Sequence, residues 1–236
     1  MTLVLLPRIR QAVVVTRDLE PLLTRLRERL DAPEPYRDPG VDRFGLRNAV
    51  LSVGDSFLEV LTPDRPDTAV GRHLDRRGGD AGYMVMLQVT DMDATRARLA
   101  DLGVRVVFEV KLPDAVDLHL HPHDVPGALV AVDTMDPPGS WRWGGPEWTG
   151  RAPATRGGIA GLTVAVPDPP TAARRWAAVA GLAAPAGPAV EFPAGQRVDF
   201  ITGNPGLVRI AFALPGAVPE SLAIGDTTLE ILETPP

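Results

Sequence analysis

The chain of 236 residues has a formal net charge of −6, with 44% hydrophobic and 23% charged residues. This composition is typical of a folded globular protein and excludes a disordered or fibrous chain. Cysteine is absent, which excludes disulfides, thiolate catalysis, zinc–thiolate sites and iron–sulfur clusters. Acidic residues outnumber basic ones and no basic stripe carries interleaved aromatics, so we expect no nucleic-acid partner.

No apolar run approaches the roughly 18 residues that a membrane-spanning helix needs, so we expect no membrane association. The apolar run Leu3 to Leu6 is too short for the core of a signal peptide. We therefore expect a cytoplasmic protein. A homodimer is left open.

A strand that leads into a helix occurs three times along the chain, at 11–30, 83–103 and 162–182. In the first copy the leucines recur at helical spacing after a strand that ends at Val15. The expected caps are Asp18, Asp91 and Asp168, and the expected helix ends are Gly103 and Gly181. The expected short strands are 44–53, 56–62, 104–110, 116–121, 128–133, 189–193 and 196–202. A truncated unit without a helix begins at Leu207, so the chain reads as four βαβββ-like units.

An internal repeat supports this reading. Residues 51–61 read LSVGDSFLEVL and residues 222–232 read LAIGDTTLEIL, with six of eleven positions identical. Both segments predict a hairpin that turns at Gly-Asp. We expect Glu59 and Glu230 to face equivalent sides of their sheets.

Two tandem domains are predicted, a complete one at 1–135 and a shortened one at 157–236. The segment between them, 136–156, is rich in Trp, Pro and Gly. Trp141 and Trp143 in this segment either anchor it over the edge of a core or form an aromatic lid on a ligand pocket.

The paired βαβββ units and the segment HPHDVPGALV at 121–130 resemble the vicinal oxygen chelate superfamily. That superfamily includes glyoxalase I, methylmalonyl-CoA epimerase, bleomycin-resistance proteins and extradiol dioxygenases. The resemblance implies an α+β fold in which paired βαβββ units form open, mixed, β-barrel-like cavities, in two tandem domains with the second shortened. Function does not follow from the fold alone, because one fold hosts many chemistries.

The family usually holds a divalent metal on two side chains from each βαβββ unit. The resemblance places Gln11 and Glu59 at the first two ligand positions. Met84 stands where a histidine is usual, and Ala131 stands at the last position, with Asp133 two residues further on.

In the C-terminal half Gly161 falls on the first ligand position and only Glu230 matches. Methionine is a soft ligand and alanine cannot ligate, so we expect no cofactor and a degenerate metal site.

Three histidines, His119, His121 and His123, alternate along one predicted strand, which would place them on one face. They could form a three-histidine metal site, supply an acid, base or hydrogen-bonding group at the edge of a pocket, or serve only structure. Against the metal site, Pro122 disturbs the strand.

Glu59 lies mid-strand between Leu58 and Val60. A carboxyl group in apolar surroundings has a raised pKa, which suits a general acid or base. Alternatively, Glu59 forms an ion pair with an arginine, such as Arg47 or Arg10, and stabilises the sheet.

Met84, Met86 and Gln88 alternate on another predicted strand face. They fit core packing or an apolar ligand pocket equally well. The run GRHLDRRGG, which contains His73, predicts a helical turn whose arginines either meet an anion or are solvated.

The sequence thus predicts a lyase or isomerase for an oxygenated small molecule or an acyl-CoA thioester, working without the usual divalent metal. Glu59 and His121 are the expected catalytic residues. The expected substrate-binding residues are Gln11, Met84, Met86, His119, Asp133, Trp141 and Trp143. The alternative is a binding protein that sequesters a small molecule, and the third hypothesis is a metal-dependent dioxygenase.

Overall fold

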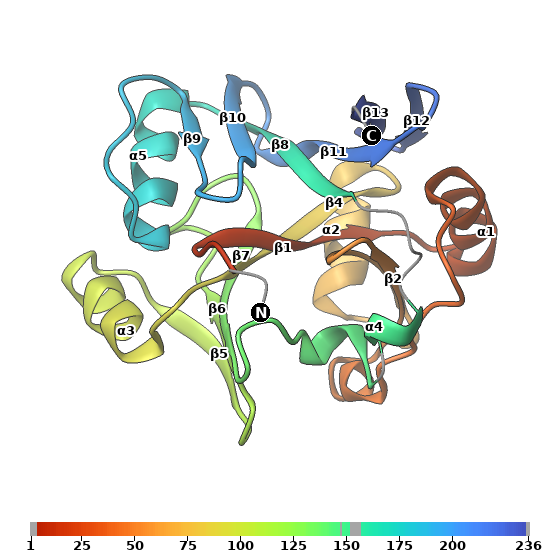
Figure 1. Cartoon of the computed structure of the whole chain (residues 1–236), viewed down its shortest axis with the longest axis horizontal. Coiled ribbons are helices and arrows are strands. Elements are labelled where there is room, and N and C mark those ends of the chain that lie inside the picture. Colours follow the sequence, from red (N-terminus) through yellow and green to blue (C-terminus); the bar gives the residue numbers. More distant parts are fainter. Residues whose placement is uncertain (1–3, 147, 152–156, 235–236) are drawn as a thin grey trace. The chain divides into compact units, whose positions relative to one another are not determined.

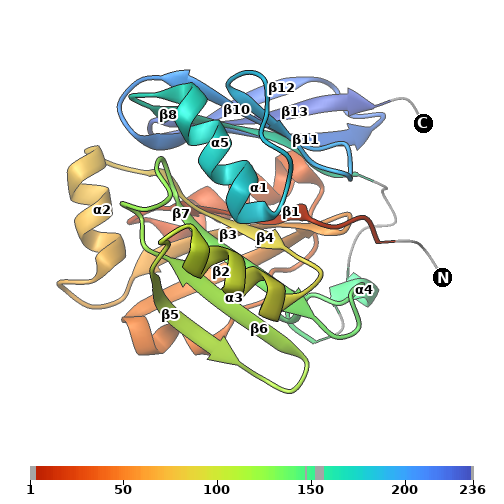
Figure 2. The ribbon, with the colours of Figure 1, turned by 90° about the vertical axis from the view of Figure 1, so that its left-hand side faces the viewer.

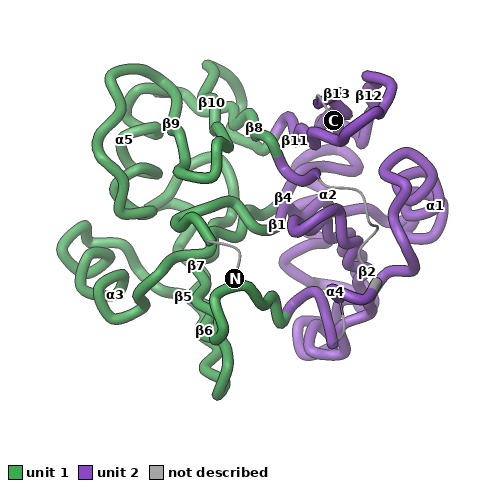
Figure 3. Tube along the Cα trace, in the orientation of Figure 1, with its two compact units in different colours: residues 1–10, 84–142, 160–207 green, residues 11–83, 143–159, 208–236 purple. Residues whose placement is uncertain are grey.

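The computed structural model describes residues 4–146, 148–151 and 157–234, whose helices and strands are labelled in Figure 1. The chain divides into two compact units, coloured separately in Figure 3. Unit 1 comprises residues 1–10, 84–142 and 160–207. Unit 2 comprises residues 11–83, 143–159 and 208–236. Each unit therefore combines segments from both halves of the chain.

Unit 2 contains most of the first and last βαβββ-like segments. Its helices are α1 (Leu19–Leu30), the 3-10 helix η1 (Pro39–Phe44), α2 (Ala69–Arg77) and the short α4 (Trp148–Arg151). Its strands are β1 (Arg8–Val15, from Gln11 on), β2 (Leu46–Val53), β3 (Ser56–Pro63), β11 (Gly206–Pro215, from Val208 on), β12 (Glu220–Ile224) and β13 (Thr227–Thr234). Strand β3 pairs in parallel with β1 and antiparallel with β2, and β13 pairs in the same way with β11 and β12.

Unit 1 contains the two middle segments. Its helices are α3 (Met92–Asp101) and α5 (Pro169–Ala180), and the 3-10 turn η2 (Arg142–Gly144) begins at its last residue. Its strands are β4 (Ala81–Gln88, from Met84 on), β5 (Val106–Lys111), β6 (Ala115–Leu120), β7 (Leu129–Met135), β8 (Gly158–Val166, from Ala160 on), β9 (Ala189–Glu191) and β10 (Arg197–Thr202). Figure 2 shows β5, β6 and β7 side by side, and their pairing is antiparallel. Strand β7 also pairs in parallel with β4.

Contacts inside each unit join segments that lie far apart in the sequence. In unit 1 the side-chain amide of Gln196 binds both the N–H and the carbonyl of Ile9, each at 2.7 Å. In unit 2 the Oγ of Ser56 accepts the N–H of Ile159 at 3.1 Å. The backbone of Ile9 and the hydroxyl of Ser56 thus find hydrogen-bond partners in the other half of the chain.

The helices begin and end largely where their sequence signals lie. The carboxylates of Asp91 and Asp168 accept N–H groups of the first turns of α3 and α5, and α5 ends at Gly181 in a left-handed conformation. Asp18 occupies the cap position of α1, but its side chain makes no capping hydrogen bond. Instead, its own N–H donates to the Oγ1 of Thr16 at 3.0 Å.

The internal repeat is confirmed by the strand register. Both segments form antiparallel hairpins around a Gly-Asp turn. The pairs Leu51–Leu58 and Ser52–Phe57 correspond to Leu222–Leu229 and Ala223–Thr228. Gly54 and Gly225 have φ of +60° and +59°, which two-residue hairpins with glycine at the first central position require.

The α+β class and the paired βαβββ units are confirmed, and the last unit omits its helix as expected. The run GRHLDRRGG forms most of a nine-residue helix, α2, rather than one turn. The compact units do not divide the chain into an N-terminal and a C-terminal part, so they do not test the predicted domain boundaries at 135 and 157. These boundaries stay a prediction. No helix among the described residues is long and apolar enough to cross a membrane.

Replacing Gly225 by Ala will destabilise the protein more than the same change at Gly78. Both glycines have positive φ, but a Cβ at Gly225 would collide with the backbone carbonyl of Asp80, whereas none would meet an atom within 4 Å at Gly78. We expect a loss of about 1 kcal/mol for Gly78→Ala and about 3 kcal/mol for Gly225→Ala in urea unfolding. Equal losses would show that the collision is relieved by movement of the turn.

Candidate functional site

Three strands of unit 2 bring Glu59 together with two amide side chains. Gln11 on β1 donates from Nε2 to Oε2 of Glu59 at 2.8 Å, and Asn48 on β2 donates from Nδ2 to Oε1 at 2.7 Å. Glu59 pairs in register with Val13 and Val50, each two residues from its amide partner, so all three polar side chains share one face. We call Gln11, Asn48 and Glu59 the carboxylate cluster.

The amide of Asn48 is fixed in orientation. Its Oδ1 accepts the backbone N–H of Asp38 at 2.9 Å, so its Nδ2 must face Glu59. Glu59 is only 8% exposed and accepts one N–H on each carboxylate oxygen. These two hydrogen bonds hold the carboxylate in a fixed orientation.

Of the two arginines expected as ion-pair partners of Glu59, Arg47 is wrong, and Arg10 stays a prediction. The Nε of Arg47 donates to Oδ1 of Asp64 at 2.7 Å, and both side chains are more than half exposed. Arg47 lies one residue before Asn48, so it projects from the opposite face of β2.

The C-terminal copy of the repeat treats its glutamate differently. Glu230 accepts from Nε of Arg209 at 2.6 Å, and both side chains are 31% exposed. Arg209 lies two residues before Ala211, the parallel partner of Glu230, so it occupies the place that Gln11 has in the first copy. At the place of Asn48 the second copy has Pro219, which carries no donor.

In unit 1, three side chains alternate on one face of β4, as the sequence predicts. Met84, Met86 and Gln88 pair in register with residues of β7: Leu129, Ala131 and Asp133. Met84 and Met86 are each 5% exposed, which fits packing in an apolar layer.

Polar groups gather at the end of this face. The fully buried Gln88 donates from Nε2 to the carbonyl of Pro138 at 2.7 Å and accepts from Nε of Arg8 at 3.0 Å. Asp133, also fully buried, lies in register with Gln88 and with Asp117 on β6. The Nε2 of His119 lies 3.0 Å from Oδ2 of Asp117.

The histidine run does not continue as one strand face. Strand β6 ends at Leu120, and Pro122 opens a turn that contains His123. The Nδ1 of His121 accepts N–H groups from the backbone of His123 at 3.2 Å and from Arg105 at 3.1 Å. The Nδ1 of His121 therefore stabilises this turn, and it is not available to a ligand while these hydrogen bonds are formed.

The same turn is hydrogen-bonded to the residue before β5 and to α5 of unit 1. Asp124 accepts from the N–H and the side chain of Arg105, and these hydrogen bonds hold the pKa of its carboxyl far below the usual range. Arg175 on α5 donates to the carbonyl of Asp124 at 2.7 Å, and the indole of Trp176 donates to that of Pro126 at 3.0 Å. The segment that carries the family resemblance is therefore well explained by structure.

The donor set does not fit the divalent metal that the family resemblance implies. Within unit 1, Met84 and Ala131 offer no ligand suited to a hard or borderline ion. Within unit 2, Gln11 and Asn48 direct N–H groups, not oxygens, at Glu59. Among the described residues no group of three His, Cys, Asp or Glu side chains is arranged to hold a metal ion. The run of His119, His121 and His123 is therefore not arranged as a three-histidine metal site.

The tryptophan side chains of the 136–156 segment pack against neighbouring side chains. Trp141 is fully buried, with the guanidinium of Arg10 lying 5.6 Å from its ring centroid. Trp148 meets Phe57 edge-on at 5.1 Å. Trp143 is partly buried. These contacts favour the anchoring role over a lid, and positions 147 and 152–156 lie outside the described residues.

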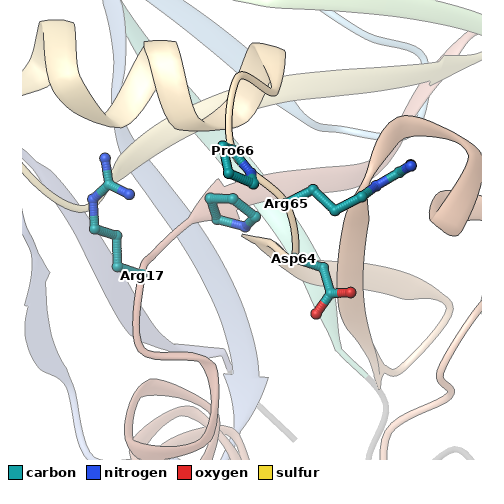
Figure 4. A pocket seen from close by; sticks show the side chains of 5 residues that line it. Arg17, Asp64, Arg65 and Pro66 are labelled. Carbon is teal, nitrogen blue, oxygen red and sulfur yellow. The ribbon is translucent and has the colours of Figure 1, made fainter.

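An open pocket of about 300 Å³ lies where β1 and β3 end, lined by Arg17, Pro63, Asp64, Arg65 and Pro66. Figure 4 shows that the side chains of Arg17, Arg65 and Asp64 point in different directions. Arg17 binds Asp75, and Arg65 donates to the carbonyl of Asp42. No polar groups converge on this pocket, so it is a poor candidate for the site.

Sequence reasoning missed Asn48 and Asp117. The alternation of RNAVLSV carried the signal for Asn48, because it places Asn48 and Val50 on one face of β2. The alternation of AVDLHL likewise places Asp117 and His119 on one face of β6, but the burial of Asp117 depends on the order of strands in the sheet. Glu59 and His121 lie in different units, and their cooperation stays a prediction.

A family model described as a glyoxalase-like domain matches residues 12–180. A variant of methylmalonyl-CoA epimerase from Streptomyces coelicolor, solved with 2-nitronate-propionyl-CoA, is 27% identical with a TM-score of 0.50, over 58% of this chain and 99% of that one. The methylmalonyl-CoA epimerase of Mycobacterium tuberculosis is 22% identical with a TM-score of 0.49, over 57% of this chain and 93% of that one. No curated protein matches the sequence.

Replacing Asn48 by Leu will destabilise the protein by about 2–3 kcal/mol, because it removes a donor from a buried carboxylate and leaves the N–H of Asp38 unpaired. The neighbouring change Arg47→Ala removes only an exposed ion pair and will cost less than about 1 kcal/mol. Urea unfolding of both variants measures the difference. A neutral Asn48→Leu would show that the carboxylate cluster does not need this amide.

Replacing His73 by Gln will flatten the dependence of stability on pH between 8 and 5. Burial, and then Arg76 and Arg77, lower the pKa of His73 below its ordinary value of 6.5, while its Nε2 contacts the carbonyl of Gly82 at 3.1 Å. The unfolded chain therefore binds the proton more readily, and the native protein loses stability as the pH falls through 6.5. The parent should lose more unfolding free energy than His73→Gln between these two pH values. Parallel losses would contradict the lowered pKa.

Proposed function

Because the chain belongs to the family of glyoxalase-like domains, we propose that it is a lyase or isomerase that moves a proton on an oxygenated small molecule. An acyl-CoA thioester is the substrate class to test first. In the proposed reaction Glu59 takes a proton from the carbon next to a carbonyl group, and the proton returns to the same molecule or to water. His121 stays the expected partner in proton transfer, and this role falls to its Nε2, because its Nδ1 accepts two N–H groups of its own turn.

The observation that carries this proposal is the geometry of the carboxylate cluster. A buried carboxylate held by one N–H on each oxygen cannot rotate away, and such fixed orientation favours general base catalysis. In the repeat copy Arg209 occupies the place of Gln11 and donates to Glu230. The first copy has an amide at that place instead.

The substrate class draws on the relatives. Solved methylmalonyl-CoA epimerases, similar to this chain over more than half of its length, carry methylmalonyl-CoA or 2-nitronate-propionyl-CoA. We propose that the reaction runs without the usual divalent metal, since the residues at the expected ligand positions do not suit one. Gln11, Met84, Met86, His119, Asp133, Trp141 and Trp143 remain the proposed substrate-binding residues, and the location in the cytoplasm and a homodimer remain predictions.

The second candidate is a protein that binds a small molecule without transforming it. The apolar face of Met84, Met86 and Ala131 favours it, because apolar lining with few polar groups is typical of ligand sites. A dioxygenase would need a site of two histidines and one carboxylate, and none is formed by the described residues.

The test is the exchange of the α-proton of methylmalonyl-CoA for deuterium in D₂O, followed by proton NMR. Glu59→Gln keeps the shape of the side chain but cannot accept the proton, so the exchange rate should fall about 100-fold or more. Glu230→Gln, the equivalent change in the repeat copy, should leave the rate within about twofold of the parent.

Addition of a chelator should leave the parent rate unchanged. An exchange rate for Glu59→Gln equal to that of the parent would remove Glu59 from the reaction. Absence of exchange in the parent, together with tight calorimetric binding of methylmalonyl-CoA, would support the second candidate.

A further inference from the structure

A second pair of chemically active side chains lies on β6 in unit 1. Asp117 and His119 alternate on this strand, so both project from the same face. The Nε2 of His119 lies 3.0 Å from Oδ2 of Asp117, which is within the distance of an ion pair. The side chain of Asp117 is 7% exposed and that of His119 is 19% exposed, so the carboxylate is buried and the imidazole still reaches solvent.

The carboxylate of Asp117 has an unusual environment. Its other oxygen, Oδ1, is buried and has no hydrogen-bond partner within the described part of the chain. A buried carboxylate oxygen without a donor is costly, and the imidazole of His119 is a cationisable group within ion-pair distance of this carboxylate.

Packing holds the ring in place. Phe108 on β5 lies opposite His119 in register, with ring centroids 5.0 Å apart and planes inclined at 56°. On the other side, the residue of β7 in register with His119 is Ala131, whose methyl group is too small to cover the ring. The Nε2 of His119 faces Asp117. When the neutral imidazole carries its proton on Nε2, its acceptor nitrogen is Nδ1.

We propose that Asp117 and His119 form a catalytic dyad in which His119 accepts a proton at Nδ1 and Asp117 is its positioning residue. The substrate class is a hydroxyl group or water that attacks an activated acyl ester. The attacking oxygen gives its proton to Nδ1 and bonds to the acyl carbon. The bond from that carbon to the leaving oxygen breaks, and the leaving group takes the proton from the imidazolium.

Among the described histidines, His119 is the one that combines a buried carboxylate partner with an unoccupied acceptor nitrogen. His121 uses Nδ1 for two N–H groups of its own turn. His73 contacts the carbonyl of Gly82 and packs edge-on against Tyr83. The dyad does not depend on the role proposed for Glu59.

The experiment measures hydrolysis of p-nitrophenyl acetate over many turnovers per protein molecule. We expect the parent to hydrolyse it above the buffer rate, with a solvent deuterium isotope effect that marks proton transfer. His119→Gln should lose about 10-fold or more of this rate together with the isotope effect. Asp117→Asn should also slow it, while the matched control His123→Gln, an exposed histidine of the following turn, should stay within about twofold of the parent.

A nitrogen NMR measurement of the histidine tautomers tests the positioning step without any substrate. In the parent, neutral His119 should carry its proton on Nε2, and Asp117→Asn should weaken that preference, because an amide can also donate to Nε2. Folding of each variant is checked by circular dichroism. A folded His119→Gln that retains the parent rate, a parent with no hydrolysis above buffer, or a proton on Nδ1 of His119 would each overturn the proposal.

Discussion

Burial of the Glu59 carboxylate is the constraint on which the candidate site depends. A carboxylate removed from water needs hydrogen-bond donors, and here they come from strands on both sides of β3. Because side chains alternate across a sheet, a shift of one residue in either pairing would turn an amide to the opposite face. The register of β1 and β2 against β3 is therefore a condition of the chemistry as well as of the fold.

The two copies of the hairpin give the same glutamate position different neighbours. In the second copy a guanidinium neutralises the glutamate at the surface of its sheet. In the first copy neutral amides orient the glutamate in a buried position. The shared backbone shows that the glutamate position belongs to the repeat, and the different partners show that its chemistry does not. The residue two positions before the parallel partner of each glutamate, Gln11 or Arg209, is thus one that differs between the copies.

Elements with local causes could be predicted, and those with non-local causes could not. The leucine period of α1 and the caps Asp91 and Asp168 are contained within a few residues, and the structure confirms them. The alternation of the three histidines was also local, but Pro122 ended the strand before His123 could join the face. The pairing of Asn48 with Glu59 required knowledge of strand register, and the environment of Asp117 required knowledge of strand order. The division into compact units carried no local signal.

Each compact unit is complete only after its C-terminal segment has been synthesised. Residues 84–142 of unit 1 must wait for 160–207, and residues 11–83 of unit 2 must wait for 208–236. Until then the N–H and carbonyl of Ile9 lack the amide of Gln196, and the hydroxyl of Ser56 lacks the N–H of Ile159. When only the first half of the chain has left the ribosome, both units are thus still incomplete. Such contacts between distant segments slow folding and prolong the exposure of apolar strands, so the growing chain is one on which chaperones would act.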